Sequence, residues 1–142
     1  MSYSRFFLLF SLVICACSSD DNYKDNPYLI DQSFRFQLHL SLPQYEQLNF
    51  PPNHIVIPQI GLNGVVIYNM NNDVYYAYEL SDPSHPLREC SAMSVDQMEA
   101  TCSCEDGNVY SIITGQPLEG AGTYSMKPYR VERLAESLII SN

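Results

Sequence analysis

Positively charged side chains are scarce in this sequence. The 142 residues include 7 Lys and Arg against 16 Asp and Glu, so the formal net charge is −9. Nucleic-acid binding depends on many Lys and Arg contacts to phosphate groups, and a chain this acidic repels a phosphate backbone. We therefore exclude nucleic acid from the expected partners.

Long apolar runs and helical periodicity are also missing. The longest mainly apolar run, residues 6–14, is about half of the roughly 20 residues that a transmembrane helix needs. No segment longer than about a dozen residues shows the 3.6-residue helical period, although residues 131–135 have room for one helical turn. The mature chain is therefore expected to have neither a membrane-spanning helix nor a helical fold.

Enzyme signatures are absent as well. The chain has no HExxH motif, no glycine-rich phosphate loop and no serine-triad signature. Its 11 tyrosines would suit a carbohydrate-binding platform, but tyrosine in strands is more commonly core or half-buried filler. We expect that the protein is not an enzyme.

The N-terminus has the layout of an export signal. Arg5 precedes the apolar residues 6–14, and the polar residues 18–21 follow. The segment Ile14-Cys15-Ala16-Cys17 resembles the lipobox of bacterial lipoproteins, in which the cysteine is acylated before cleavage. The resemblance implies a signal peptide over residues 1–16 and a lipid such as palmitate on Cys17. An ordinary secretory signal cut near Ala16 is the alternative.

The lipid determines the expected location. Each buried CH₂ contributes about 0.8 kcal/mol, so a multiply acylated Cys17 would hold the protein to a membrane. Residues 18–21, Ser-Ser-Asp-Asp, resemble the acidic tetrapeptide that sends some Gram-negative lipoproteins to the cell surface. We expect a cell-envelope protein that is lipid-anchored to the outer membrane, and both the periplasmic and the surface-exposed face stay open.

The rest of the chain suits one domain. About 126 residues follow the signal, which is enough for one core and too few for two ordinary domains. Residues 17–27 end at the turn signal Asn26-Pro27 and are expected to form the lipidated N-terminus and a flexible tether. The domain is expected over residues 28–142. It contains three cysteines in an oxidising compartment, which allows one disulfide and one free thiol.

The pattern of this domain is all-β. Residues 34–40 alternate apolar and polar side chains, which places Phe34, Phe36, Leu38 and Leu40 on one face of a strand. Residues 43–52 are expected to be a loop, because prolines and Asn49 interrupt both the helical and the strand period. Turn residues separate further β-rich runs at hairpin spacing, over residues 54–57, 64–68, 74–78, 100–104, 109–113, 126–131 and 137–140. We predict a small antiparallel barrel or sandwich.

Residues 74–131 carry a more specific arrangement. An aromatic strand, residues 75–79, leads to one loop, and Cys102-Ser103-Cys104-Glu105 marks a second. A strand, a proline-containing loop at residues 115–122 and a closing strand follow. In this order the segment resembles the Rieske family, whose domains hold a 2Fe-2S cluster between two loops through two cysteines and two histidines. The resemblance implies a Rieske-like β domain.

Most of the family's ligands are replaced in this chain. The family spacing, counted back from Cys102, puts the first-loop cysteine at Asp82 and its histidine at Ser84, while the second-loop histidine falls on Glu105. Only Cys102 keeps a family ligand. We therefore expect no cofactor and a module that binds an unknown envelope protein or ligand, or has a structural role. The alternative is an electron-transfer protein with an atypically ligated 2Fe-2S cluster.

The two remaining cysteines have a separate explanation within the family. Many members carry an extra cysteine in each loop, joined by a disulfide that clamps the cluster site. The resemblance implies a Cys90–Cys104 bridge, with a small insertion at residues 85–89, and Cys90–Cys102 is the rival pairing. Closing a loop of about 15 residues contributes roughly 3 kcal/mol in the chain-entropy model.

Two other chemistries were weighed for these loops, a metal site and a catalytic carboxylate pair. Zinc accepts Cys and His ligands, but the separation of Cys102 and Cys104 is tighter than the usual spacing of structural sites. Neighbouring carboxylates can act as acid and base, yet they are expected by chance among 16 acidic residues. We therefore expect neither. The zinc set considered is His85, Cys90, Cys102 and Cys104, and the carboxylates are Asp82, Glu105, Asp106 and Glu119.

Overall fold

The computed structural model describes residues 26–142. The expected signal peptide and the lipidation site Cys17 lie outside this range, whereas the expected β domain lies inside it. Within the described part of the chain, no helix is both long enough and apolar enough to cross a membrane.

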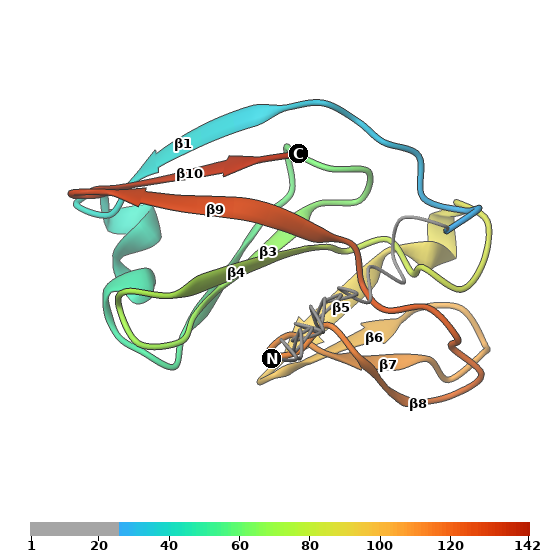
Figure 1. The fold of residues 1–142 in the computed structure, drawn as a ribbon. Helices are drawn as coiled ribbons and strands as arrows, with labels where there is room; N and C mark the ends of the chain where they lie inside the picture. The colour runs from blue at the N-terminus through green and yellow to red at the C-terminus, as the bar shows by residue number, and fades with distance from the viewer. Residues whose placement is uncertain (1–25) are drawn as a thin grey trace, which may run out of the picture.

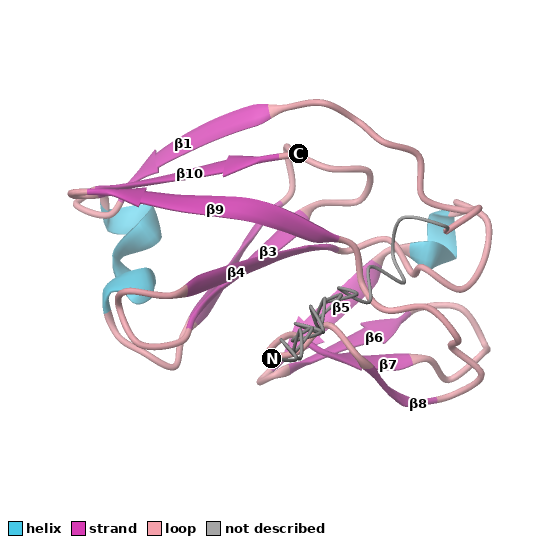
Figure 2. Cartoon of the chain, in the orientation of Figure 1, coloured by secondary structure: helices cyan, strands magenta, loops and turns pink. Residues whose placement is uncertain are grey.

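The described residues form ten strands in two antiparallel sheets (Figures 1 and 2). The larger sheet has the strand order β1-β10-β9-β4-β3-β2, and the smaller sheet has the order β5-β6-β7-β8. The larger sheet comprises β1 (Arg35–His39), β2 (His54–Ile57), β3 (Val65–Asn69), β4 (Tyr75–Glu79), β9 (Pro128–Leu134) and β10 (Ser137–Ser141). The smaller sheet comprises β5 (Met93–Asp96), β6 (Glu99–Cys102), β7 (Val109–Ser111) and β8 (Pro117–Glu119).

The larger sheet curls on itself into a half-barrel. Strands β4 and β9 pair at only two positions, Ala77 with Tyr129 and Tyr78 with Pro128, so they diverge beyond this junction. In Figure 1, β1, β10 and β9 lie on one side of the resulting hollow and β3 and β4 on the other. Apolar side chains from both sides fill it, among them Leu38, Ile67 and Leu138.

The strand β3 connects two hydrophobic cores because it is buried on both faces. All five of its residues are buried, and successive side chains of a strand point to opposite faces. Val65 and Ile67 therefore pack inside the half-barrel, whereas Val66 and Tyr68 pack against the smaller sheet. This double burial fixes the position of the smaller sheet, which carries one of the loops described below.

The all-β class and most of the expected strands are confirmed. Along β1 the apolar side chains alternate with exposed polar ones, and Leu38 is 1% exposed. One expectation is wrong. The expected loop at residues 43–52 contains a 3₁₀ helix, η1 (Pro43–Asn49), which Pro43 suits because it begins the helix. The helical turn for which residues 131–135 have room does not form either, because β9 pairs with β10 over most of this segment.

Candidate functional site

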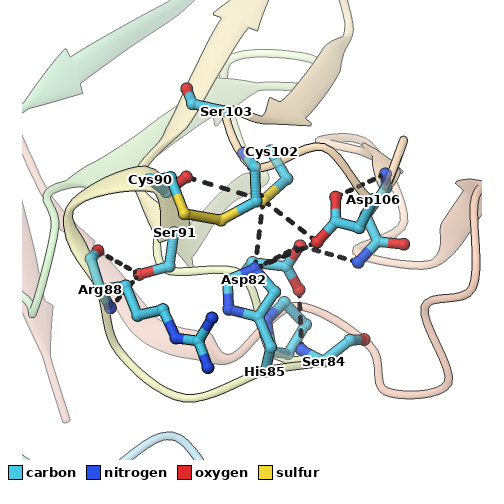
Figure 3. Close-up of polar contacts among 12 residues, drawn as sticks. Asp82, Ser84, His85, Arg88, Cys90, Ser91, Cys102, Ser103 and Asp106 are labelled. Carbon is cyan, nitrogen blue, oxygen red and sulfur yellow. Dashed lines mark hydrogen bonds and ion pairs between the residues drawn. A yellow bond between two sulfur atoms is a disulfide. The ribbon is translucent and has the colours of Figure 1, made fainter.

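Two loops meet at one end of the smaller sheet. The first, residues 80–92, connects β4 to β5 and contains a short 3₁₀ helix, η2 (Glu89–Ser91). The second, residues 103–108, connects β6 to β7. A disulfide joins them between Cys90 and Cys104, with their Cα atoms 4.8 Å apart (Figure 3). This is the pairing that the family resemblance implies, and it leaves Cys102 as a buried free thiol.

The base of the first loop is held by a buried carboxylate. Glu79, at the end of β4, is fully buried and accepts hydrogen bonds from the backbone N–H groups of Leu62 and Asn63 at 2.8 and 2.9 Å. It also accepts from Ser81, through both backbone and hydroxyl, and from the Tyr129 hydroxyl at 2.7 Å. These bonds tie the β2–β3 turn, β4 and β9 together, so the loop starts from a rigid point.

Asp82 is the most deeply placed of the expected site residues. It is fully buried, and its Oδ1 accepts hydrogen bonds from the Ser84 backbone at 2.7 Å and from the Tyr110 hydroxyl at 2.9 Å. Its Oδ2 accepts one from the Asn108 side chain at 3.0 Å. Burial raises the pKa of Tyr110, so its hydroxyl keeps the proton that it donates. Three donors thus hold this carboxylate in one orientation.

Cys102 faces the same space from the end of β6. Its sulfur accepts a hydrogen bond from the backbone N–H of Cys104 at 3.4 Å and lies 3.6 Å from Asp106 Oδ2. Burial raises the pKa of the thiol to about 12; the Cys104 N–H opposes this shift, while Asp82 and Asp106 add to it. In the absence of a cation the thiol is therefore protonated at neutral pH.

His85 completes the group. Its Nε2 lies 3.2 Å from Cys102 Sγ, 3.2 Å from Asp106 Oδ2 and 3.6 Å from Asp82 Oδ2. The His85 side chain is 18% exposed and that of Asp106 is 27% exposed, so the group lies just below the surface. Figure 3 shows these side chains pointing toward one another.

The other expected site residues are elsewhere or are occupied. The Ser84 hydroxyl is within hydrogen-bond distance of the Tyr110 hydroxyl at 2.9 Å and accepts a bond from the Thr123 backbone at 3.2 Å. Glu105 and Glu119 are exposed. Of the three sulfurs in the zinc set that the sequence disfavours, two are not available, because Cys90 and Cys104 are bonded to each other.

Sequence reasoning missed two supporting residues, Asn108 and Tyr110. Asn108 was assigned only to a turn and Tyr110 only to a strand, yet both donate to Asp82 across 26 and 28 residues of sequence. The one sequence signal for such a supporting role is a side chain with a polar group in an otherwise apolar strand. It does not identify the partner, since the partner comes from another loop.

The site does not fit the 2Fe-2S cluster that the fold implies. Such a cluster needs four ligands, which are four thiolates in ferredoxins and two thiolates with two imidazoles in Rieske centres. Among the described residues, Cys102 is the one free thiol, because the other two cysteines form the disulfide. His85 is the one imidazole beside it. The two loops thus offer half of a Rieske ligand set.

Comparisons with known proteins support the fold. No protein-family model and no curated protein sequence matches this chain. Among solved structures, the apo form of the quaternary ammonium Rieske monooxygenase CntA aligns with a TM-score of 0.50 at 17% identity, covering 84% of this chain and 35% of that one. This similarity shows a Rieske-like fold, and the chain spans about a third of that enzyme.

Two smaller proteins align over nearly their whole length. The ferredoxin of carbazole 1,9a-dioxygenase from Nocardioides aromaticivorans is 16% identical, with a TM-score of 0.45 and coverage of 78% of this chain and 97% of that one. The E. coli protein NirD is 14% identical, with a TM-score of 0.45 and coverage of 78% and 98%. The alignments are too distant to transfer a function.

Proposed function

We propose that this chain is a lipoprotein, anchored to the outer membrane through Cys17, whose Rieske-like domain carries no 2Fe-2S cluster and acts as a binding or structural module of the cell envelope. The observation that carries the proposal is the Cys90–Cys104 disulfide beside a single free thiol. This arrangement keeps the clamp between the two loops but supplies only one thiol and one imidazole of the four ligands that a Rieske cluster needs.

The polar contacts of the loops support the absence of a cluster. Two of the substituted ligand positions, Asp82 and Ser84, are hydrogen-bonded to Tyr110. A third, Glu105, is exposed. Side chains that are satisfied within the protein make a stable apoprotein, because buried polar groups without partners are costly. The domain can therefore fold without iron and sulfide.

The disulfide also supports the proposed location. Disulfides persist in secreted and envelope proteins and are rare in the reducing cytoplasm. The lipobox-like segment ending at Cys17 accounts for export and attachment together. The braced first loop presents Leu87, which is 49% exposed, beside the surface at His85. We assign contact with an envelope partner to this end of the domain.

Lipidation is tested by labelling cells that express the full chain with radioactive palmitate. The label is expected on the wild type and on C15S, and it should disappear in C17S. Labelling of C17S to the wild-type level would contradict the anchor. Pull-down with the lipidated protein, compared with L87E, then tests the assigned surface: a partner lost in L87E supports it, and a partner retained in L87E contradicts it.

Cluster content is tested on the full chain purified in detergent. Iron, acid-labile sulfide and visible absorption are measured on one sample. We expect no stoichiometric sulfide and no cluster spectrum. A stoichiometric 2Fe-2S spectrum that bleaches in C102S and D82N would instead establish electron transfer through an atypical cluster.

A further inference from the structure

Three donor atoms from the two loops lie close together, and a fourth lies beside one of them. They are His85 Nε2, Cys102 Sγ, Asp106 Oδ2 and Asp82 Oδ2, and the four separations recorded among them range from 3.2 to 3.6 Å (Figure 3). We propose that these side chains bind a single divalent transition-metal ion, of which Zn²⁺ is the reference case. The proposal goes beyond the function above and rests on it in one respect, that no 2Fe-2S cluster occupies the same loops.

The four known separations match four of the six edges of a tetrahedral coordination shell. With metal bonds of about 2.0 Å to nitrogen and oxygen and about 2.3 Å to sulfur, the edges of a tetrahedron are about 3.3 to 3.6 Å. The observed values are 3.2 Å from His85 to Cys102, 3.2 Å from His85 to Asp106, 3.6 Å from His85 to Asp82 and 3.6 Å from Cys102 to Asp106. Along these four edges a metal ion needs only small side-chain adjustments.

No single proton on His85 Nε2 serves all of its neighbours, although the Cys102 thiol can itself donate to Asp106 Oδ2 and a protonated His85 would pair with both carboxylates. One ring N–H points at one acceptor, because hydrogen bonds weaken steeply away from linearity. Nε2 nevertheless lies within 3.6 Å of a sulfur and two different carboxylates. A cation at the centre of the group can bind the nitrogen, the sulfur and both carboxylate oxygens together. A proton on Nε2 can be shared with only one of these neighbours.

The other ring nitrogen favours the tautomer that a metal requires. His85 Nδ1 lies 3.0 Å from the carbonyl oxygen of Pro86. An N–H at Nδ1 donates to this oxygen and leaves the lone pair of Nε2 directed into the group. Metal-binding histidines usually have this arrangement, with the distal nitrogen bonded to a carbonyl or carboxylate. The backbone after His85 thus orients the ring for coordination.

The remaining ligands are supported in the same way. Asp82 is held by Tyr110, Asn108 and the Ser84 backbone, as described above. The backbone N–H of Asn108 donates to the outer oxygen of Asp106 at 3.1 Å, which leaves Oδ2 facing the group. The turn that this needs passes through Gly107, whose φ of 69° suits glycine. Such outer contacts hold ligands in place and raise metal affinity.

The chemistry of the donors selects the class of metal. One thiolate, one imidazole and two carboxylates suit Zn²⁺ and its transition-metal neighbours, whereas Mg²⁺ and Ca²⁺ prefer oxygen ligands alone. Cys104 Sγ lies within 4.8 Å of the donor atoms of its neighbours but belongs to the disulfide, so it is not available as a thiolate. The set differs from the zinc ligands considered from sequence in replacing both disulfide cysteines by Asp82 and Asp106.

The test uses the purified full chain after treatment with a chelator. Calorimetric titration with Zn²⁺ is expected to show one ion per chain, and Co²⁺ should give tetrahedral d–d bands together with a thiolate-to-cobalt charge-transfer band. H85Q and D106N, at partly exposed positions, should each weaken Zn²⁺ binding by at least about tenfold. The matched controls H54Q and D96N lie outside the group and should bind as the wild type does.

Each other outcome overturns the proposal. Failure to bind Zn²⁺ and Co²⁺ would show that His85 is held by ordinary ion pairs, and equal binding by H85Q and D106N would place the metal elsewhere. Circular dichroism of the variants separates lost ligands from lost folding, and C102S should remove the charge-transfer band while the fold persists. Acid-labile sulfide, measured on the same sample, tests the proposed function separately: a cluster overturns both proposals, whereas a metal-free and sulfide-free chain overturns only this one.

Discussion

Removal of the Cys90–Cys104 disulfide by the double substitution C90A/C104A is expected to destabilise the domain by about 3 kcal/mol. The two cysteines are 14 positions apart. In the chain-entropy model, opening a loop of about 15 residues returns about 10 cal/mol/K to the unfolded chain, which is about 3 kcal/mol at 25 °C. Alanine suits both the short 3₁₀ helix at position 90 and the loop at position 104, so the unfolded state carries most of the effect.

Urea unfolding of chelator-treated protein measures this loss without a contribution from metal. With a slope of about 2 kcal/mol/M, the midpoint of unfolding should fall by about 1.5 M. The wild type under reducing conditions should show a similar loss. S103A, an exposed change in the same loop, should shift the midpoint by much less. A double variant as stable as the wild type would refute the view that the bridge restrains the two loops.

Three further predictions concern the scaffold around the site, and urea unfolding checks each one. G115A should lose about 2 kcal/mol more than G107A, because both positions have positive φ but only at Gly115 does a Cβ meet a ring, that of Tyr78 at 2.7 Å; equal losses would contradict this. E79Q should lose about 3 kcal/mol, since an amide replaces a buried carboxylate that accepts five hydrogen bonds, and exposed E99Q is its control. Burial raises the pKa of Tyr78 to about 12. The neutral side chain therefore contributes fully to the free energy of unfolding below about pH 10, and this contribution is lost as the pH rises toward 12. Between about pH 9 and about pH 11, the free energy of unfolding of Y78F should therefore fall by about 1 kcal/mol less than that of the wild type. An equal pH dependence of the two proteins would refute the raised pKa of Tyr78.

The fold could be predicted where side-chain alternation or apolar runs are clear. Residues 34–40 specify a strand because their period of two matches one buried face, and β3 appears as a short apolar run. Two strands were missed, β5 and β8. Both strands are short. Strand β8 begins at Pro117 and its residues are partly or fully exposed, so neither β-propensity nor an apolar pattern predicts it. At residues 131–135 a weak local pattern leaves room for a helical turn, but pairing with β10 makes most of this segment a strand.

The site could be predicted only in part. Family spacing identified Asp82 and Cys102 as positions facing one another across the loops, and the structure places both beside His85. The position of Asp106 beside His85 was not foreseen, because it depends on a turn held by Asn108 and on a loop clamped by the disulfide. The disulfide joins two different loops, and residue type and spacing alone do not encode how those loops meet.

The most direct measurement is the elemental content of the purified full chain, with zinc, iron and acid-labile sulfide determined on one sample beside its visible spectrum. The account predicts about one divalent transition-metal ion per chain, no stoichiometric sulfide and no iron–sulfur absorption. About two irons and two sulfides per chain, with the matching spectrum, would contradict it.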